Sequence, residues 1–247
     1  MKIVFLGTNG WYNTTLANTT CIFIETEGHY IIFDAGDGLY KIDRFIKQAK
    51  PIHLFLSHFH LDHITGLHTL NKFNFPQGLK IYGQKGIREF LTRVICSPYS
   101  VDISKLLYKV DLLEIEEGYH RLPFLIECRR LRHSTECFGY RLEINNKVIT
   151  YCPDTGVCDN AMILARDADL VMCECSLRSG QDNKAWPHLN PELAAQIANK
   201  AKAKKMALIH FNPHFYPSTV ERRIAEQEAK RIFNNSFQAV DDLEIFI

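Results

Sequence analysis

Four side chains that commonly bind metal ions lie within six residues, namely His58, His60, Asp62 and His63. They directly follow an apolar, strand-like run that ends at Ser57. Imidazole and carboxylate groups are ligands that divalent zinc, iron and manganese accept. An extended turn can present His58 and His60 to one ion, while Asp62 and His63 reach a second ion nearby. The pattern therefore predicts a metal-dependent enzyme; a chance cluster of surface histidines is the alternative.

Two metal sites need further ligands, because each ion takes about three protein ligands and keeps one position open. Three candidates each follow a strand-like run of their own: His133, Asp154 and His210. A carboxylate between two ions can bridge them, and this is the role we predict for Asp154. Two ions roughly 3.5–4 Å apart can share a hydroxide and stabilise both the attacking and the leaving oxygen. The complete set predicts a two-metal hydrolase.

Short runs rich in Ile, Val, Phe and Tyr predict the strands that position these residues. Two helices are also well marked, because Asn190 precedes a proline and an acid, and Ser218 precedes Glu221 by three residues. Weaker helices are expected after Gly38, Leu61 and Gln84, and hairpin turns at Gly28 and Asn145-Asn146. We find no internal repeat or flexible linker, so the expected architecture is one layered α/β domain over residues 1–247. The predicted strands are Lys2–Leu6, Thr20–Thr26, Tyr30–Phe33, Ile52–Leu56, Leu79–Tyr82, Leu122–Cys128, Phe138–Ile144, Lys147–Tyr151, Leu170–Cys173, Met206–Ile209 and Leu243–Ile247.

The composition excludes several classes of protein. The formal net charge of +1 gives no global electrostatic reason to bind nucleic acid or an anionic membrane. No apolar run approaches the ~20 residues that span a bilayer, and the amino terminus lacks the features of a secretory signal. We therefore expect a cytoplasmic protein without a membrane partner. Its eight cysteines form no C-x-x-C pair, and we interpret them as reduced, structural thiols.

These motifs together resemble the metallo-β-lactamase superfamily, and within it the phosphodiesterases related to ribonuclease Z. The resemblance implies a four-layer αββα sandwich with the metals at one edge between the sheets. It also implies that His58, His60 and His133 hold one ion, that Asp62, His63 and His210 hold the other, and that Asp154 bridges them. Zinc is the expected metal, with manganese or iron as alternatives. The motifs are Phe5-Leu-Gly-Thr8, Ile32-Phe-Asp34-Ala-Gly36, Ser57–Leu67, His133-Ser134, Phe138-Gly-Tyr140, Pro153–Gly156, Glu174, His188 and Ile209-His210-Phe211.

The same resemblance implies that Glu174 and His188 form a pair that assists the leaving group, and we group both with Asp62 as catalytic residues. A histidine whose second nitrogen is held by a carboxylate can protonate a departing alkoxide. A loop histidine that contacts Trp186 or solvent is the alternative for His188. Asp34, which follows a strand, is expected to support the ligands rather than to bind metal. The histidines outside these motifs are read as structural or surface residues.

The members that process tRNA carry a long arm between the positions that match His133 and Asp154. Only 20 residues separate the two here, which is enough for two strands and a turn. Affinity for nucleic acid comes largely from many phosphate contacts, so RNA is a possible but not favoured substrate. A small, possibly cyclic, phosphodiester is favoured.

Three other functions remain open, namely a ribonuclease Z-like RNA endonuclease, a thioester or lactone hydrolase, and a non-catalytic metal-binding regulator. The segment 71–113 is expected to form a lid, a homodimer contact or an ordinary helix with its connecting loops.

Overall fold

The computed structural model describes residues 1–247, and their contacts group them into two compact units, each with one seven-stranded sheet. The first unit contains Met1–Gly7, Ala17–Glu116 and Val240–Phe246. The second contains Thr8–Leu16, Glu117–Ala239 and Ile247. Both sheets are mixed and carry helices, which confirms the predicted α/β class. No helix is both long and apolar enough to cross a lipid bilayer.

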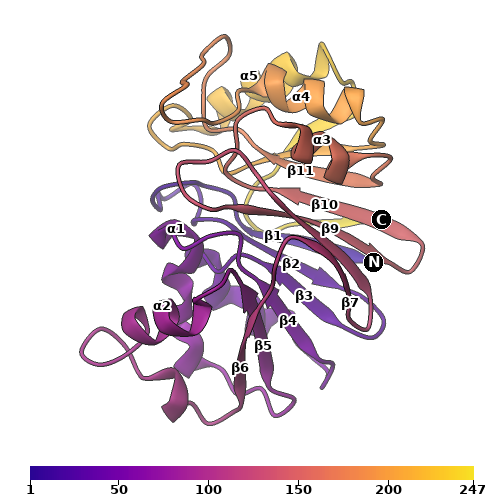
Figure 1. The fold of residues 1–247 in the computed structure, drawn as a ribbon. Coiled ribbons are helices and arrows are strands. Elements are labelled where there is room, and N and C mark those ends of the chain that lie inside the picture. The colour runs from indigo at the N-terminus through magenta and orange to yellow at the C-terminus, as the bar shows by residue number, and fades with distance from the viewer. The chain divides into compact units, whose positions relative to one another are not determined.

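The sheet of the first unit has the strand order β14-β1-β2-β3-β4-β5-β6 (Figure 1). Neighbouring strands are antiparallel from β14 to β3 and parallel from β3 to β6. The strands are β1 (Lys2–Gly7), β2 (Cys21–Glu25), β3 (Tyr30–Phe33), β4 (Ile52–Phe55), β5 (Leu79–Gly83), β6 (Val110–Glu114) and β14 (Leu243–Phe246).

Short helices connect the parallel strands of this unit. They are η1 (Asp37–Arg44), α1 (Leu61–Ile64), η2 (Thr65–Lys72), α2 (Ile87–Val94) and η3 (Ile103–Lys105). Leu39 of η1 and Leu67 of η2 belong to one buried apolar core with Val4, Phe23 and Leu54 of the sheet. Because crossover connections keep the strands parallel, the carboxyl ends of β3 and β4 meet at one edge of the sheet.

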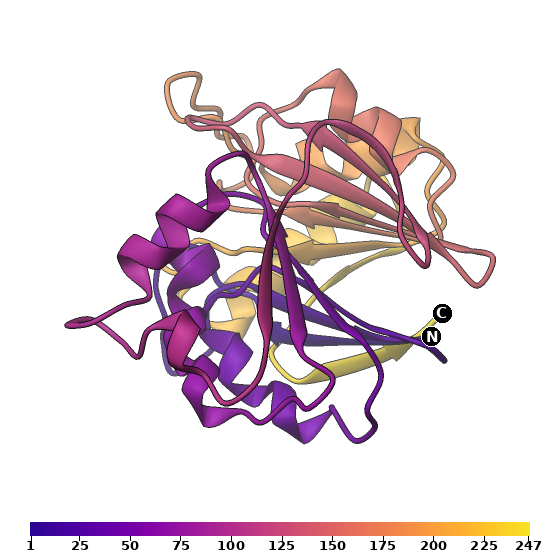
Figure 2. The ribbon, with the colours of Figure 1, turned by 60° about the horizontal axis from the view of Figure 1, so that its bottom comes forward.

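The second unit has the strand order β13-β12-β11-β10-β9-β8-β7 (Figure 2). Strands β7 to β10 are antiparallel neighbours, and β10 to β13 are parallel. The strands are β7 (Gly118–Arg121), β8 (Leu125–Arg130), β9 (Phe138–Ile144), β10 (Lys147–Cys152), β11 (Leu170–Glu174), β12 (Met206–Ile209) and β13 (Ser236–Gln238). The helices are α3 (Asp159–Ala165), α4 (Pro191–Lys200) and α5 (Thr219–Lys230).

The helix ends and hairpins of this unit match their sequence signals. The side chain of Asn190 accepts a hydrogen bond from the amide of Leu193 at 2.8 Å and caps α4. Ser218 caps α5 by accepting from the amide of Val220 at 3.1 Å. Asn145 and Asn146 both have positive φ and join β9 to β10 in a tight hairpin. These predictions are confirmed.

The predicted strand Leu122–Cys128 is confirmed only from Leu125 onward, because residues 122–124 form a turn. The amide of Leu122 bonds to the carbonyl of Phe124 at 2.9 Å, and β7 and β8 lie on either side of that turn. The sequence also failed to indicate β6, β7, β13 and α3, each of which has polar residues in at least two positions. The segment 71–113 contains α2 and η3, and it also contributes β5 and most of β6 to the sheet. Its role as a lid or dimer contact stays a prediction.

Candidate metal centre

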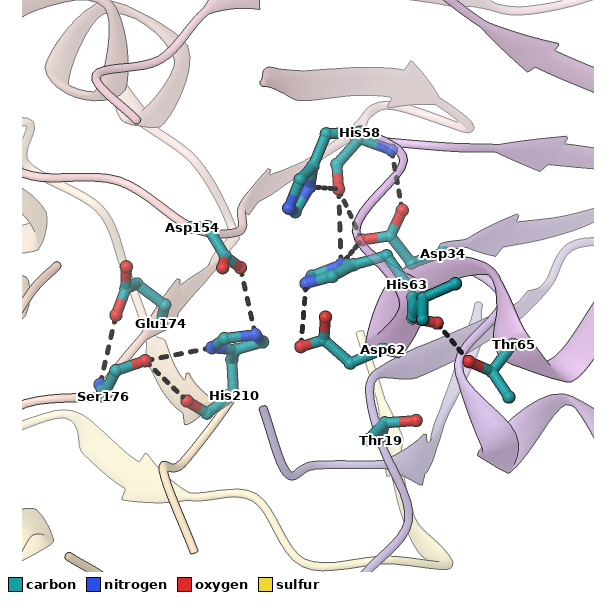
Figure 3. A network of polar contacts seen from close by, with 12 residues as sticks. Thr19, Asp34, His58, Asp62, His63, Thr65, Asp154, Glu174, Ser176 and His210 are labelled. Atoms are coloured by element: carbon teal, nitrogen blue, oxygen red, sulfur yellow. Dashed lines mark hydrogen bonds and ion pairs between the residues drawn. The ribbon is translucent and has the colours of Figure 1, made fainter. Parts of the chain in front are cut away.

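In the first unit, a buried carboxylate organises the cluster that follows β4. Asp34 follows β3 directly and has a positive φ of 56°. Its Oδ1 accepts a hydrogen bond from the amide of Ser57 at 2.6 Å, and its Oδ2 accepts from the Ser57 hydroxyl at 2.7 Å. The same Oδ2 lies 2.6 Å from Nδ1 of His63 (Figure 3). Asp34 therefore ties the end of β3 to the metal-ligand segment, the supporting position expected for it.

These hydrogen bonds determine which ring nitrogen of His58 and His63 faces the site. An ionised carboxylate can only accept, so Nδ1 of His63 carries the proton that it gives to Asp34. The hydroxyl proton of Ser57 also goes to Asp34, so the Ser57 oxygen accepts from Nδ1 of His58, 3.0 Å away. In both rings the lone pair is then on Nε2. This is how carboxylates and hydroxyls commonly orient metal-binding histidines.

The other two ligand candidates of the first unit lie beside this pair. The ring of His60 is 4.5 Å from the ring of His58, measured between centroids, and the ring of His63 is 4.2 Å from that of His58. Oδ2 of Asp62 lies 3.5 Å from Nε2 of His63. The backbone at Gly36 lies very close to the backbone at Asp62, because a Cβ on Gly36 would lie 2.6 Å from the carbonyl oxygen of Asp62. The first unit thus gathers all four side chains of the H-x-H-x-D-H motif.

In the second unit, ligand-type side chains follow the parallel strands β10 and β12. Oδ1 of Asp154, after β10, lies 3.0 Å from Nε2 of His210, after β12. Oδ2 of Asp154 lies 3.9 Å from Nε2 of His133. The Ser176 hydroxyl donates to the carbonyl of His210 at 3.0 Å, so its oxygen accepts from Nδ1 of the same residue at 3.0 Å (Figure 3). His210 therefore directs the lone pair of Nε2 at a carboxylate oxygen.

The backbone of the loop after β1 supports the ring of His210. Asn9 pairs with Phe211 in an isolated bridge, and the amide of Gly10 bonds to the carbonyl of Phe211 at 2.9 Å. A Cβ on Gly10 would lie 2.3 Å from Cε1 of His210, which is far inside contact distance. Only glycine fits at this position, and the backbone of Gly10 packs directly against the ring of His210.

Glu174 and His188 form a hydrogen-bonded pair in the second unit. Nδ1 of His188 lies 2.6 Å from Oε1 of Glu174, whose side chain is fully buried. Glu174 also accepts from the amide of Thr155 at 2.7 Å and from the amide of Ser176 at 3.1 Å. The His188 ring stacks on His210 with 6.2 Å between centroids. The Glu174 carboxylate thus accepts from two amides and from Nδ1 of His188, which fixes the direction of the His188 ring.

A family model for the β-lactamase superfamily domain matches residues 29–211, about three quarters of the chain. The chain belongs to the metallo-β-lactamase superfamily. The α/β fold with two mixed sheets is the fold of this superfamily, and the protein is a metal-dependent hydrolase. Divalent metal ions are the cofactors that this superfamily fold implies.

Relatives and solved structures agree with that membership. The chain is 27% identical to ribonuclease Z of Bacillus cereus over 305 aligned positions, covering 98% of this chain and 97% of the relative. It is similar to the metallo-β-lactamase fold protein YhfI of Bacillus subtilis, with a TM-score of 0.81, 22% identity and coverage of 99% and 98% of the two chains. The short form of human tRNase Z gives a TM-score of 0.77 at 23% identity, covering 100% and 99%. The predicted resemblance to ribonuclease Z is confirmed as a similarity over the whole chain.

Sequence reasoning missed the residues that hold the ligand candidates in place, namely Ser57, Ser176 and Gly10. Ser57 stands inside the motif but its type has no distinctive signal, and Ser176 and Gly10 lie far from His210 in the sequence. Among the remaining histidines, His53 is buried and stacks on Tyr82 with 5.9 Å between ring centroids. Burial lowers the pKa of His53 to about 4, with help from the charges of His29 and Lys80. It is a neutral, structural side chain.

Proposed function

We propose that the ligand groups of the two units form one dinuclear metal site within a single domain. The family match supports this, because residues 29–211 include both groups. Each group alone offers too few ligands for two ions that each need about three. In this arrangement His58, His60 and His133 hold one ion, Asp62, His63 and His210 hold the other, and Asp154 bridges them.

The residues fit divalent ions by donor type and by geometry. His58, His63 and His210 each commit Nδ1 to an oxygen and keep the Nε2 lone pair for a ligand. In the second unit that lone pair of His210 faces a carboxylate oxygen 3.0 Å away, an arrangement of two electron-rich atoms that a shared cation stabilises. Zinc suits this set of imidazoles and carboxylates, with manganese or iron as alternatives. Such ions activate a water molecule and neutralise charge that develops on a phosphate.

The reaction that we propose is the hydrolysis of a phosphodiester, and the Glu174–His188 pair carries this assignment. The alkoxide that leaves a phosphodiester is a strong base and needs a proton. As an imidazolium, with a proton on each nitrogen, His188 would give the Nε2 proton to the leaving oxygen and become neutral, while Glu174 accepts from Nδ1 and stabilises the charged form before the transfer. A thiolate leaving group needs less help, so the pair favours phosphodiesters over thioesters. Asp62 is proposed to hold metal and to orient the attacking water.

The substrate that we propose is small and possibly cyclic. Between His133 and Asp154 the chain forms only β9, β10 and the Asn145-Asn146 turn, so no arm is inserted at this position. The alignment with the bacterial ribonuclease Z is longer than this chain, so that relative carries residues that have no counterpart here. Fewer contacts with phosphates disfavour a large folded RNA.

A substrate panel tests this function. Protein loaded with zinc, manganese or iron should hydrolyse bis-p-nitrophenyl phosphate and at least one cyclic nucleotide, and should leave precursor tRNA intact. The Asp154→Asn variant, measured alongside, should lose bound metal and activity together. Failure with every metal would refute the phosphodiesterase assignment. Preferred hydrolysis of a thioester or lactone would move the enzyme to acyl transfer, and preferred cleavage of precursor tRNA would make it a nuclease.

The predicted location and assembly also stay proposals. None of the eight cysteines is in a disulfide. A hydrogen bond with Cys173, together with burial, raises the pKa of Cys152, and burial raises the pKa of Cys175, which makes both thiols unreactive. Free thiols are typical of the reducing cytoplasm, and this supports a cytoplasmic location. A homodimer, which would contain two such sites, should be visible as twice the chain mass in light scattering.

A further inference from the structure

Both tryptophans of this chain are exposed, and both lie in the second unit near its chemical groups. Trp11 has 67% of its surface exposed and Trp186 has 50%. Tryptophan usually has most of its surface buried in protein cores. An exposed tryptophan contributes little free energy of apolar burial to folding. The exposure of both rings therefore indicates a role at the surface.

Trp186 stands beside the proposed proton donor. Its ring centroid is 6.3 Å from that of His188 and 6.1 Å from that of His133. The backbone around it is anchored, because the side chain of Asn183 accepts from the amides of Ala185 and Trp186 at 3.1 Å and 3.0 Å. The flat apolar ring of Trp186 is therefore held beside the ring of His188, the proposed proton donor.

Trp11 directly follows Gly10, the residue that contacts the ring of His210, on a loop that is held by hydrogen bonds. Its φ of 65° is in the left-handed region, which costs energy for any residue except glycine. The guanidinium of Arg222, only 1% exposed, donates to Thr8 Oγ1 at 3.0 Å and to the side chain of Asn9. The amide side chain of Asn9 in turn donates to the carbonyl of Tyr12 at 3.1 Å. The neighbouring Gly10 contacts the ring of His210.

The buried Arg222 therefore holds a strained loop whose Gly10 contacts a metal-ligand candidate and whose next residue is the exposed Trp11. Strain of this kind is found where a function requires it. The ring of Trp11 lies edge-on to the ring of Tyr12, with 5.1 Å between centroids, and is 67% exposed, so burial of Trp11 offsets little of the strain.

We propose that Trp186 and Trp11 are stacking surfaces for nucleobases, so that the substrate is a nucleotide phosphodiester rather than a simple alkyl diester. The assignment rests on the proposed phosphodiesterase function, and it specifies the substrate class for that site. Aromatic rings hold bases by stacking without reading their sequence. Trp186 takes the base attached to the ribose at the scissile phosphate, and Trp11 takes a second base where the substrate has one.

Tryptophan fluorescence gives the first test, because each emission can be isolated. The metal-loaded variants Trp11→Leu and Trp186→Leu each contain one tryptophan. Titration with 2′,3′-cyclic AMP should quench the emission of Trp186 in the Trp11→Leu variant. Glycerol 1,2-cyclic phosphate, which has the same phosphate ring and no base, should leave it unchanged. Equal responses to the two compounds, or no response to either, would overturn the assignment.

Kinetics with the same two compounds give the second test. Trp186→Leu should raise KM for 2′,3′-cyclic AMP by roughly 5- to 150-fold, the range for loss of one stacked base, and should not change KM for glycerol 1,2-cyclic phosphate. Trp186→Phe should recover most of the loss. Tyr119→Leu, which removes an aromatic side chain of similar exposure on β7, is the matched control and should change neither value.

The possible failures are distinguishable. If the wild-type protein hydrolyses neither cyclic phosphate, the proposed function fails, although base-dependent quenching of Trp186 would still be observed. If both are hydrolysed but Trp186→Leu raises both KM values equally, the function stands and the nucleobase site is refuted. Retained metal and an unchanged circular dichroism spectrum exclude a folding defect in each variant.

Discussion

Replacing His188 by alanine should slow the cleavage of a poor leaving group far more than that of a good one. Nδ1 of His188 lies 2.6 Å from Glu174, and that carboxylate is held by the amides of Thr155 and Ser176. The imidazole is therefore fixed in direction and tautomer, with Nε2 left for the leaving oxygen. Removing it deletes the proton donor and leaves the metal-ligand candidates in place.

The size of the effect follows from the chemistry of the leaving group. A positioned general acid contributes roughly 10²- to 10⁴-fold, or about 3–5 kcal/mol of barrier. The ribose alkoxide released from 2′,3′-cyclic AMP needs that proton, so kcat should fall by an amount in this range. A nitrophenolate is a stable anion, so bis-p-nitrophenyl phosphate should lose less than about tenfold.

The assay compares kcat for both substrates in the wild type and the variant, at matched metal content. His214→Ala is the control, because His214 is an exposed histidine of the same unit; it should change neither rate. Glu174→Gln should give an intermediate loss on the cyclic nucleotide, since the ring stays but its charge is less well stabilised. If His188→Ala slows both substrates equally while metal is retained, His188 is structural. An unchanged rate on both would remove it from the reaction.

Three further outcomes are expected. Asp34→Ala should weaken metal binding by roughly 10- to 100-fold, because His63 loses the acceptor that orients its ring; competition with a chelator measures this, and unchanged affinity would refute the supporting role. Gly10→Ala should disturb His210, since its Cβ would lie 2.3 Å from the ring, and the metal content per chain should fall; full occupancy would contradict it. The pKa of His53 is lowered to about 4 in the folded protein, from an unfolded value near 6.5. Between these two values the unfolded state binds more protons than the folded state. The free energy of unfolding should therefore decrease by up to about 3 kcal/mol as the pH is lowered from 6.5 to 4. His53→Phe should remove that part of the pH dependence in urea unfolding, and a wild-type stability that is flat from pH 6.5 to 4 would refute the neutral buried state.

The ligand candidates could be predicted because their positions follow a simple rule of parallel sheets. His58, Asp154, Glu174 and His210 each come at the end or just after the end of a strand that the sequence marks by an apolar run. Strand ends of parallel neighbours meet at one edge, so a polar residue there is placed without knowledge of the full fold. Helices α4 and α5 could be predicted as well, because the signals for their caps lie within three residues of one another in the sequence.

The residues that orient the ligands could not be predicted, because their partners are distant in sequence. Ser176 contacts His210, and Arg222 contacts Thr8 and Asn9 more than 200 positions away. Serine and arginine are common surface residues, and nothing local distinguishes these from others. The start of the strand predicted at Leu122 was placed three residues too early, since the turn at residues 122–124 contains Leu122 and Phe124 and does not differ in composition from the apolar residues that follow.

The same two kinds of hydrogen bond orient histidine rings in the two units. In each, a buried carboxylate next to a strand end accepts from Nδ1 of one histidine: Asp34 from His63, and Glu174 from His188. In each, a serine hydroxyl accepts from Nδ1 of a second histidine: Ser57 from His58, and Ser176 from His210.

This shared pattern explains why the carboxylates are buried despite the cost of removing a charge from water. Asp34 and Glu174 each accept three hydrogen bonds from amide, hydroxyl or imidazole donors, which offset that cost. In return, four imidazoles lose the freedom to rotate or to change tautomer, and all four present Nε2. A metal ion and a leaving oxygen make opposite demands on that nitrogen, a lone pair in one case and a proton in the other. All four histidines have the same kind of hydrogen bond at Nδ1. The groups around Nε2 must therefore determine whether a histidine is a metal-ligand candidate or, like His188, a proposed proton donor.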